Sequence, residues 1–206
     1  MIWYKFISII ALIFCFVTCT FHFVRLLKLG SPKEFSRIKG DISKAVRFSM
    51  TGAMNPSKKE SAFLHLPTYT AGVIYHLGTF LSILLFFLIL IDVPVSKPLN
   101  LFLSLFLFLT TTCGIGIFIK RVVQRKLRSL SNPDDYISNG LVTLFQLLSA
   151  IILISSDIKM LYFLGSSILL FYLPAGKLKH AVYFFAARYH LGFFYGSRDV
   201  WPPKKI

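Results

Sequence analysis

The sequence predicts an all-α integral membrane protein, a bundle of five transmembrane helices with its N-terminus outside and its C-terminus in the cytoplasm. Hydrophobic residues make up 55% of the 206 residues and charged residues only 15%, with a mean hydropathy of +0.69. A soluble domain carries about 25% charged residues, so this composition excludes a soluble enzyme and a disordered segment. The third observation behind the prediction is the uneven distribution of Lys and Arg along the chain.

Five apolar stretches are long enough to cross a membrane, because a hydrocarbon core of ~30 Å requires ~20 helical residues. They are residues 2–24, 62–91, 99–119, 137–155 and 160–178. Their unbroken apolar character favours helices over the alternating strands of a barrel. The first stretch exceeds the apolar core of a signal peptide and no small-residue cleavage site follows it, so we expect a retained helix.

The Lys and Arg residues set the predicted orientation. Twenty of the 23 lie in loop 25–61, in the segment 120–128 after the third span, and from Lys177 to the C-terminus. With six acids, that side carries a net charge of +14, while three cations and two acids give the other side +1. Cytoplasmic loops are rich in Lys and Arg, so loop 25–61 and tail 179–206 are predicted to be cytoplasmic. The total charge of +15 therefore indicates a membrane protein, and nucleic acid is not an expected partner.

Local patterns support a single membrane domain over residues 1–206. The sequence Asn132-Pro133-Asp134-Asp135 predicts a turn with acidic residues at the start of the fourth helix. Within the basic loop 25–61, five apolar residues recur at intervals typical of an amphipathic helix that lies on the membrane surface or under a partner. They are Phe35, Ile38, Ile42, Val46 and Phe48. A solvated basic loop is the alternative for this segment.

The three cysteines, Cys15, Cys19 and Cys113, all fall within predicted spans and are expected to be buried apolar residues. No Cys-x-x-Cys-His motif is present, which excludes covalent attachment of a c-type haem. Thiols near water are too few for an iron–sulfur cluster.

Histidines within spans are costly, so each is a candidate functional residue. His65 and His76 are eleven residues apart, which places both on one face of the second helix with a rise of ~16.5 Å. His180 and His190 follow the fifth span, ten residues apart, with a rise of ~15 Å if the helix continues. Because the second and fifth helices run in opposite directions, the four imidazoles are predicted to form two layers. His22 has no such mate and is interpreted as an interfacial histidine.

Two layers of histidine favour haem over zinc. Structural zinc sites require four converging ligands, whereas haem requires one axial imidazole on each side and an apolar, aromatic surrounding. The expected aromatic surrounding is Tyr69, Tyr75, Phe80, Phe171, Tyr172, Tyr183, Phe184 and Phe185, with Gly72 and Gly78 allowing close approach to the backbone. The expected partners of the haem propionates are Lys58, Lys59, Lys177, Lys179 and Arg188.

Several segments resemble a known family. The stretch from His65 to Gly78 (HLPTYTAGVIYHLG) resembles the second helix of the membrane cytochrome b (gamma) subunit of respiratory nitrate reductase, and 173–180 (LPAGKLKH) resembles the end of that family's fifth helix. The basic run after the third helix, followed by Asp134-Asp135, is also similar. The tail 195–203 (YGSRDVWPP) looks closer to related cytochromes of sulfite-reduction and heterodisulfide-reductase-like membrane complexes.

This resemblance implies one or two b haems that carry electrons between quinone and a cytoplasmic iron–sulfur or catalytic partner subunit, in a prokaryotic cytoplasmic membrane. His65, His76 and His180 match the family's ligand positions. The family's fourth ligand lies near the outer start of the fifth helix, where this sequence has Met160 and Tyr162. Either His65 pairs with His180, leaving His76 with Met160 or without haem, or His76 pairs with His180 and His65 pairs with His190.

The expected function is that of a haem b electron-transfer subunit that is not catalytic alone and has no catalytic residue of its own. Its surroundings are membrane lipid, quinone and a partner subunit. The alternative is a haem-free membrane anchor or assembly subunit whose histidines serve hydrogen bonds. A small transporter is disfavoured because the spans carry few polar residues and no inverted repeat.

Overall fold

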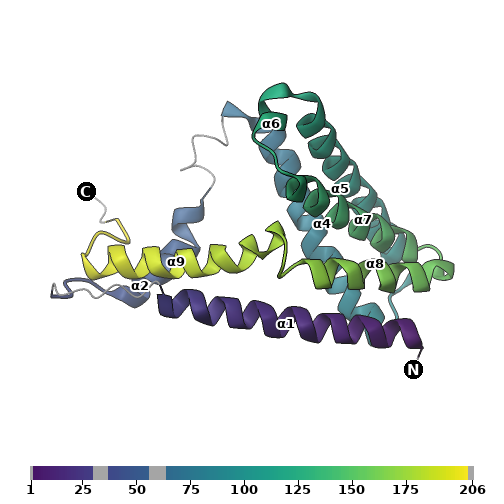
Figure 1. The fold of residues 1–206 in the computed structure, drawn as a ribbon, viewed down its shortest axis with the longest axis horizontal. Helices are drawn as coiled ribbons and strands as arrows, with labels where there is room; N and C mark the ends of the chain where they lie inside the picture. The colour runs from purple at the N-terminus through teal and green to yellow at the C-terminus, as the bar shows by residue number, and fades with distance from the viewer. Residues whose placement is uncertain (1, 30–36, 56–63, 204–206) are drawn as a thin grey trace. The chain divides into compact units, whose positions relative to one another are not determined.

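The computed structural model describes residues 2–29, 37–55 and 64–203, and within these ranges the chain is helical with no β-strand (Figure 1). Its long helices are α1 (Trp3–Leu29), α4 (Leu66–Leu90), α5 (Lys97–Val123), α7 (Pro133–Ile152), α8 (Lys159–Tyr172) and α9 (His180–Ser197). The shorter elements are α2 (Ile42–Met50), η1 (Gly52–Met54), α6 (Arg125–Ser129), η3 (Ser156–Ile158) and η4 (Lys177–Lys179).

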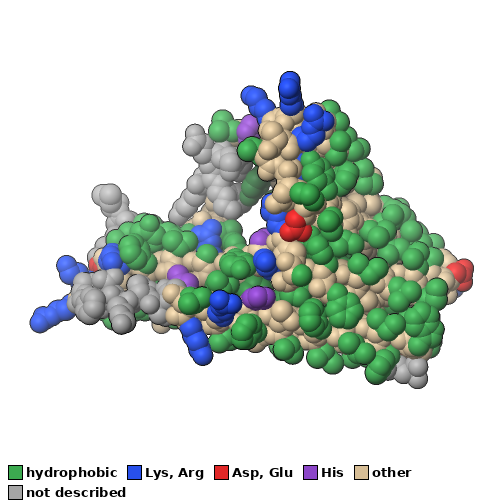
Figure 2. Space-filling view, viewed as in Figure 1, with side chains coloured by type: hydrophobic (Ala, Val, Ile, Leu, Met, Phe, Trp, Pro, Cys, Tyr) green, Lys and Arg blue, Asp and Glu red, His purple; other side chains and the backbone are tan. Residues whose placement is uncertain are grey.

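Four helices, α1, α4, α5 and α7, are each long and apolar enough to cross a membrane. The total is five if α8 and α9, which meet this criterion only together, are counted as one broken span. Much of the surface is hydrophobic (Figure 2), as expected when lipid is the solvent. These features indicate a multi-pass membrane protein. The membrane orientation of its termini stays a prediction.

The fifth predicted span differs from the structure, because no continuous helix covers residues 160–178. Helix α8 ends at Tyr172, and the backbone N–H groups of Ala175 and Gly176 both donate to the Tyr172 carbonyl oxygen in a turn. Pro174 explains this end, since its ring removes an N–H donor and collides with the preceding helical turn. A new helix, α9, then begins at His180.

The described residues pack as two compact units. Unit 1 comprises Met1–Cys15 and His65–Leu178, and unit 2 comprises Phe16–Leu64 and Lys179–Ile206. That the whole chain acts as a single membrane domain stays a prediction.

Helices α4, α5, α7 and α8 with the start of α1 form unit 1. Its core gathers buried aromatic side chains, with Phe145 and Tyr162 stacked at 6.2 Å and Phe86 6.2 Å from Phe163, measured between ring centroids. Backbones approach closely at Gly78, where any added Cβ would overlap the Thr110 side chain. Small residues at such contacts are typical of helices that pack in a bilayer.

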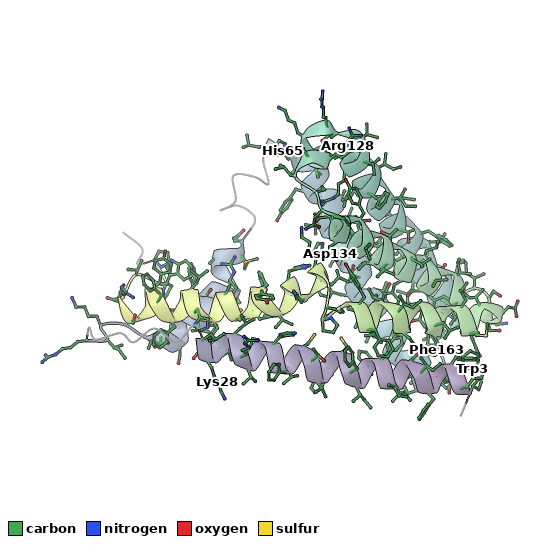
Figure 3. The ribbon with its side chains drawn as sticks, in the orientation of Figure 1. Trp3, Lys28, His65, Arg128, Asp134 and Phe163 are labelled. Carbon is green, nitrogen blue, oxygen red and sulfur yellow. The ribbon has the colours of Figure 1, made fainter. Side chains whose placement is uncertain are left out.

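The two ends of unit 1 differ in charge. One end, called the basic end here, holds the α5–α6 cations Lys120, Arg121, Arg125, Lys126 and Arg128, with Lys177 and the acids Asp134 and Asp135. The opposite end holds Lys5, Lys97 and Lys159 with Asp92 and Asp157. Figure 3 shows His65 and Arg128 at the basic end and Trp3 and Phe163 towards the other.

The predicted turn before the fourth helix is confirmed as a capping box. Asn132 accepts a hydrogen bond from the Asp135 backbone N–H at 3.1 Å, and the Asp135 carboxylate accepts one from the Asn132 backbone N–H at 3.0 Å. Pro133 occupies the first turn, where a missing N–H costs nothing. The Asp135 carboxylate also pairs with Lys177 and lies 3.3 Å from Arg121, which ties α5 and the segment after α8 to α7.

In unit 2, the amphipathic helix expected in loop 25–61 is confirmed over α2, which starts at its N-cap Asp41. Phe35, at the beginning of the expected pattern, lies outside the described residues. Helix α2 packs on α9, where an added Cβ at Gly192 would lie 2.5 Å from the Val46 Cα and one at Gly196 would lie 2.6 Å from the Ala45 Cβ. Its buried face is therefore covered within the chain.

Candidate cofactor-binding histidines

His76 lies on α4 with its imidazole exposed, in the middle of an apolar face that also exposes Val73, Leu77 and Phe80. Its Nδ1 is 2.7 Å from the Gly72 carbonyl oxygen. A carbonyl can only accept a hydrogen bond, so Nδ1 carries the proton and Nε2 carries the free lone pair. Metal-binding histidines are commonly held in this way, with one ring nitrogen donating to a carbonyl and the other facing the metal.

Space is available beside this imidazole. A Cβ added at Gly72 would meet no atom within 4 Å among the described residues, so a flat ring can approach the backbone there. His76 thus fits the role of an axial haem ligand, because Nε2 has a free lone pair, the surrounding side chains are apolar and there is space for a flat ring beside it.

His65 is placed differently from the sequence prediction. Helix α4 begins at Leu66, and His65 is its N-cap residue with φ −133° and ψ 45°, outside helical geometry. The alignment of His65 and His76 on one helical face requires the helix to include His65, so that alignment does not follow from the structure. The His65 side chain is exposed at the basic end of unit 1 and makes no capping hydrogen bond.

His180 and His190 both lie on α9, as the spacing argument required. His180 is the first residue of the helix and is exposed, whereas His190 is half-buried. The His190 Nε2 lies 3.2 Å from the Leu26 carbonyl oxygen near the end of α1, and must donate to it. A nitrogen that carries this proton cannot bind a metal, so His190 serves a contact within unit 2 in this conformation.

The four histidines are divided between the units, with His65 and His76 in unit 1 and His180 and His190 in unit 2. Their pairing across a haem stays a prediction. One alternative, Met160 as the partner of His76, can be tested within unit 1. Met160 is next to Lys159, whose charge acts on Asp92 just beyond the end of α4, while His76 is 14 residues before that end, or ~21 Å. This separation is too large for one iron.

The candidate propionate partners have different surroundings. Lys58 and Lys59 lie outside the described residues. Lys177 pairs with Asp135 in unit 1, Lys179 precedes α9, and the Arg188 guanidinium lies 5.5 Å from the centre of the Phe184 ring. Propionate binding by these residues stays a prediction.

Two of the expected aromatic residues point to internal hydrogen bonds of unit 1. The Tyr75 hydroxyl is 3.0 Å from the Thr143 hydroxyl, and the Tyr172 hydroxyl is 3.1 Å from that of Ser138. Phe80, Phe171, Tyr183, Phe184 and Phe185 are exposed, and Tyr69 is half-buried.

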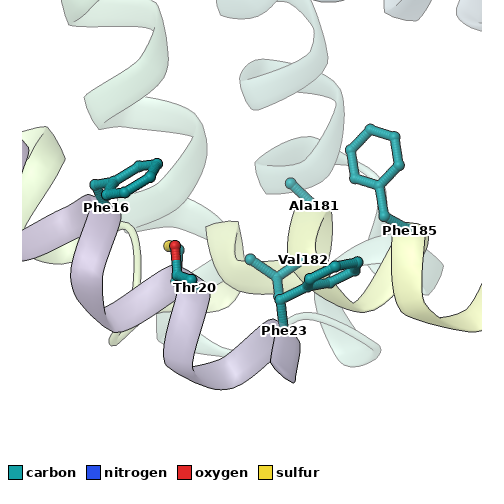
Figure 4. Close-up of a pocket in the computed structure, with 7 residues that line it drawn as sticks. Phe16, Thr20, Phe23, Ala181, Val182 and Phe185 are labelled. Atoms are coloured by element: carbon teal, nitrogen blue, oxygen red, sulfur yellow. The ribbon is translucent and has the colours of Figure 1, made fainter. Parts of the chain in front are cut away.

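Unit 2 contains an apolar pocket of about 350 Å³ between α1 and α9 (Figure 4). Its lining residues are Phe16, Cys19, Thr20, Phe23, Ala181, Val182 and Phe185. No candidate ligand histidine is among them, so the pocket offers hydrocarbon contact but no metal ligand of the expected kind. Cys15 is buried as expected and Cys19 and Cys113 are half-buried, with no disulfide among them.

The described ranges contain no group of three or more His, Cys, Asp or Glu side chains able to hold a bare metal ion. Haem is not subject to this criterion, because its porphyrin supplies four of the iron's ligands and the protein adds one or two.

The sequence interpretation missed a buried polar group inside unit 1. Gln146 on α7 is fully buried, and its Nε2 donates to the Tyr75 carbonyl oxygen at 3.0 Å and to the Thr79 hydroxyl at 2.8 Å. The recurrence of Asn139, Thr143 and Gln146 at intervals of four and three was a signal for this polar face of α7.

Comparisons with protein-family models, with curated proteins and with solved structures found no match for this chain. The classification therefore rests on the structure, whose described residues form an all-helical, multi-pass membrane protein. On α4 this protein exposes a histidine, His76, whose Nδ1 proton is held by a backbone carbonyl.

Proposed function

We propose that the protein is a haem b-containing membrane subunit that transfers electrons between the quinone pool and a cytoplasmic iron–sulfur or catalytic partner, in a prokaryotic cytoplasmic membrane. The observation that carries this proposal is His76, whose Nδ1–H is bound by the Gly72 carbonyl and whose Nε2 faces outward from an apolar helix face. An imidazole facing lipid is unfavourable, and coordination of a haem iron by its Nε2 offsets this cost.

The other residues have assigned roles in this proposal. His180 is the preferred ligand on α9, since His190 donates its Nε2 proton to Leu26. Arg188, Lys179 and the loop cations Lys58 and Lys59 bind propionates. A bound b haem supplies one-electron transfer, while this chain positions it and excludes water from it. The Lys and Arg residues of the segments predicted to be cytoplasmic, 25–61, 120–128 and 177–206, are the proposed binding residues for a partner subunit.

The experiment is a reduced-minus-oxidised visible spectrum of the purified full-length protein, combined with extraction and quantification of haem. His76→Ala is expected to remove or shift a b-type signal, and His180→Ala is expected to do the same. His22→Ala is the matched control, because His22 lies on α1 without a comparable bonded geometry and should leave the spectrum unchanged. Circular dichroism of each variant establishes that the helices are retained.

A haem-free anchor or assembly subunit is the second candidate, and one observation favours it. His190, Tyr75 and Tyr172 all use their polar atoms in hydrogen bonds within their own units. A well-folded wild-type protein without b-type absorption after expression with sufficient haem would support this candidate and overturn the first.

A further inference from the structure

The pocket of unit 2 is an apolar site of ligand size. Its α1 residues lie three or four positions from one another in turn, so they share one helical face, and that face is opposed by the first turns of α9. Among the lining side chains only Cys19 and Thr20 carry a polar atom. Its volume of about 350 Å³ falls in the usual range of ligand pockets, ~300–1,000 Å³. The pocket therefore suits a hydrocarbon chain.

The position of the pocket along α1 corresponds to the hydrocarbon of one leaflet. Helix α1 is long and apolar enough to cross a membrane, and its apolar run ends at Arg25. The lining residues Phe16 and Phe23 precede Arg25 by nine and two residues, or ~13.5 and ~3 Å along the helix. Half of a typical hydrocarbon core is ~15 Å. The pocket thus covers most of one leaflet, with its Phe23 end next to the headgroup level.

Beyond Phe23, α1 and α9 are joined directly. The His190 Nε2 donates to the Leu26 carbonyl oxygen at 3.2 Å. Leu26 lies between the cations Arg25 and Lys28 on α1. The contact therefore brings the positively charged end of α1 to the same end of the pocket.

Helix α9 places a further cation at this end. Figure 4 shows Phe16 and Phe185 at opposite ends of the lining side chains. Arg188 follows Phe185 by three residues, about one helical turn, and is half-buried. Its guanidinium lies 5.5 Å from the centre of the Phe184 ring. A guanidinium held beside an apolar pocket at headgroup level can bind a phosphate with two parallel hydrogen bonds.

The charge of unit 2 favours an anionic ligand. Its described residues include nine Lys and Arg and only two acids, Asp41 and Asp199. One of these acids, Asp41, caps α2 and pairs with Lys44 at 3.4 Å. No acid lies on α9 itself, from His180 to Ser197. An anionic headgroup beside Arg188 therefore meets attraction from several cations.

We infer that this pocket binds one acyl chain of an anionic phospholipid and that Arg188 binds its phosphate. A quinone fits the lining less well, because its two carbonyl oxygens need donors and the Thr20 hydroxyl is the only strong one among these side chains. The site does not depend on haem. Although Arg188 is also a proposed propionate partner, its guanidinium has five N–H donors, which is enough for two anions.

Cys19 provides the reporter for the test, because its thiol group belongs to a lining residue. Cys113, which is also half-buried but lies on α5 in unit 1, serves as the internal reference. The full-length protein is stripped of lipid in detergent and treated with N-ethylmaleimide, and the alkylation of each cysteine is followed by mass spectrometry. Phosphatidylglycerol at ten times its dissociation constant should slow alkylation of Cys19 about tenfold and leave Cys113 unchanged.

Other additives distinguish the possible ligands. Phosphatidylcholine should protect Cys19 less than phosphatidylglycerol does, and inorganic phosphate should not protect it. Equal protection of Cys19 and Cys113, or protection of neither, would overturn the site. Equal protection by the two lipids would contradict the anionic headgroup, and protection by inorganic phosphate alone would contradict the acyl chain. Stronger protection by a long-chain quinone would overturn the proposal in favour of a quinone site.

Two alanines of α9 allow a matched test of the acyl chain. Both are exposed, but only Ala181 lines the pocket, while Ala187 does not. Ala181→Phe fills the pocket and should abolish the effect of phosphatidylglycerol on Cys19, whereas Ala187→Phe should retain it. Circular dichroism and the Cys113 rate establish that each variant is folded. Retention of the lipid effect in a folded Ala181→Phe variant would contradict the site.

Two arginines of the same region test the headgroup. Arg188→Gln should reduce protection by phosphatidylglycerol to the level of phosphatidylcholine, with the phosphatidylcholine effect unchanged. Arg198→Gln is the control, because Arg198 lies 3.7 Å from the Phe194 ring centre, three turns further along the chain from the pocket. Haem content is measured in the same samples. Loss of haem from the Arg188 variant with lipid preference retained would overturn the headgroup assignment and leave Arg188 to the propionate.

Discussion

The Lys5 ammonium lies 2.6 Å from both carboxylate oxygens of Asp92, joining the first turn of α1 to the second residue after the end of α4. The Lys5 side chain is 11% exposed, and its Nζ is also 3.4 Å from the Leu90 carbonyl oxygen and 5.7 Å from the centre of the Phe163 ring. One buried cation thus fixes the N-terminus of unit 1 to two other helices. Lys5, which the charge distribution assigns to the outside of the membrane, therefore also has a structural role within unit 1.

Replacing Lys5 should destabilise unit 1 and change its acid sensitivity. The hydrogen bond and charge of Lys5 lower the pKa of Asp92 below its ordinary value of 3.8. The stability that this pair contributes is therefore complete above that value, and it is lost as the pH falls through the lower, folded-state pKa. Lys5→Met should lower the thermal unfolding midpoint at pH 7 and remove this acid-side loss. Lys97→Met is the control. An unchanged midpoint for Lys5→Met would contradict the role of the pair.

Asp92 itself has a left-handed backbone conformation, with φ 54°. Asn tolerates this conformation but a β-branched residue does not. Asp92→Asn should therefore lose only the ion pair, whereas Asp92→Val should lose the pair and add backbone strain. The midpoints of unfolding in a detergent titration are expected to fall in the order wild type, Asp92→Asn, Asp92→Val. Equal midpoints for the two variants would show that the backbone conformation carries no cost.

Side chains at Gly192 and Gly196 should separate α2 from α9. An added Cβ at either position lies too close to α2, and such overpacking costs about 1–3 kcal/mol. Gly192→Ala is expected to accelerate trypsin cleavage after Lys44 and Arg47 on α2, followed by mass spectrometry. Gly116→Ala is the control, because its Cβ would meet no atom within 4 Å among the described residues. Equal cleavage of the two variants would contradict the packing.

Loss of the Asn132 cap should destabilise α7 by about 0.5–2 kcal/mol. Asn132→Ala removes the acceptor of the Asp135 backbone N–H, while Asn132→Ser keeps one. The free energy of unfolding, measured by circular dichroism, should fall for the alanine variant and be largely restored for serine. Equal losses in both variants would indicate that the side-chain cap is not the cause.

His190→Phe should release the end of α1 without loss of haem. The hydrogen bond to the Leu26 carbonyl contributes about 1 kcal/mol, so trypsin cleavage after Arg25 and Lys28 should rise ~5-fold. Tyr189→Phe, on the neighbouring position of α9, provides the control. If the His190 variant lost haem while α1 stayed protected from trypsin, His190 would instead be identified as a haem ligand.

The helices that cross the membrane could be predicted from the sequence because their apolar length is a property of each segment alone. Helices α1, α4, α5 and α7 each overlap a predicted span, with ends that differ by a few residues. The fifth did not follow, because residues 160–178 were predicted as one continuous span, and the chain instead turns after Tyr172, where Pro174 cannot continue the helix, and starts a new helix at His180. The capping box at Asn132 was readable because it depends on residues four positions apart or fewer.

The site was less predictable, because the positions and bonding partners of its side chains depend on how each helix is rotated and which helices it contacts. The sequence placed His190 correctly on a helix after the fifth span, but nothing in its spacing revealed that its Nε2 would reach the Leu26 carbonyl oxygen. Similarly, Tyr75 was expected beside a cofactor, yet its hydroxyl bonds Thr143 on α7. Residues far apart in the chain can bond the same polar atom, and the local sequence pattern does not predict which of them does so in the folded protein.

The early end of α8 has a consequence for the lipid around it. With 14 residues, α8 is ~21 Å long, whereas the hydrocarbon core of a typical bilayer is ~30 Å thick. The Lys177 cation that follows is held by Asp135 at the start of α7, so it cannot move freely towards the headgroups. Helix α8 by itself is therefore ~9 Å shorter than this core, a mismatch that is met by local thinning of the lipid or by continuation of the span into α9, whereas the 27-residue α5 matches the full thickness alone.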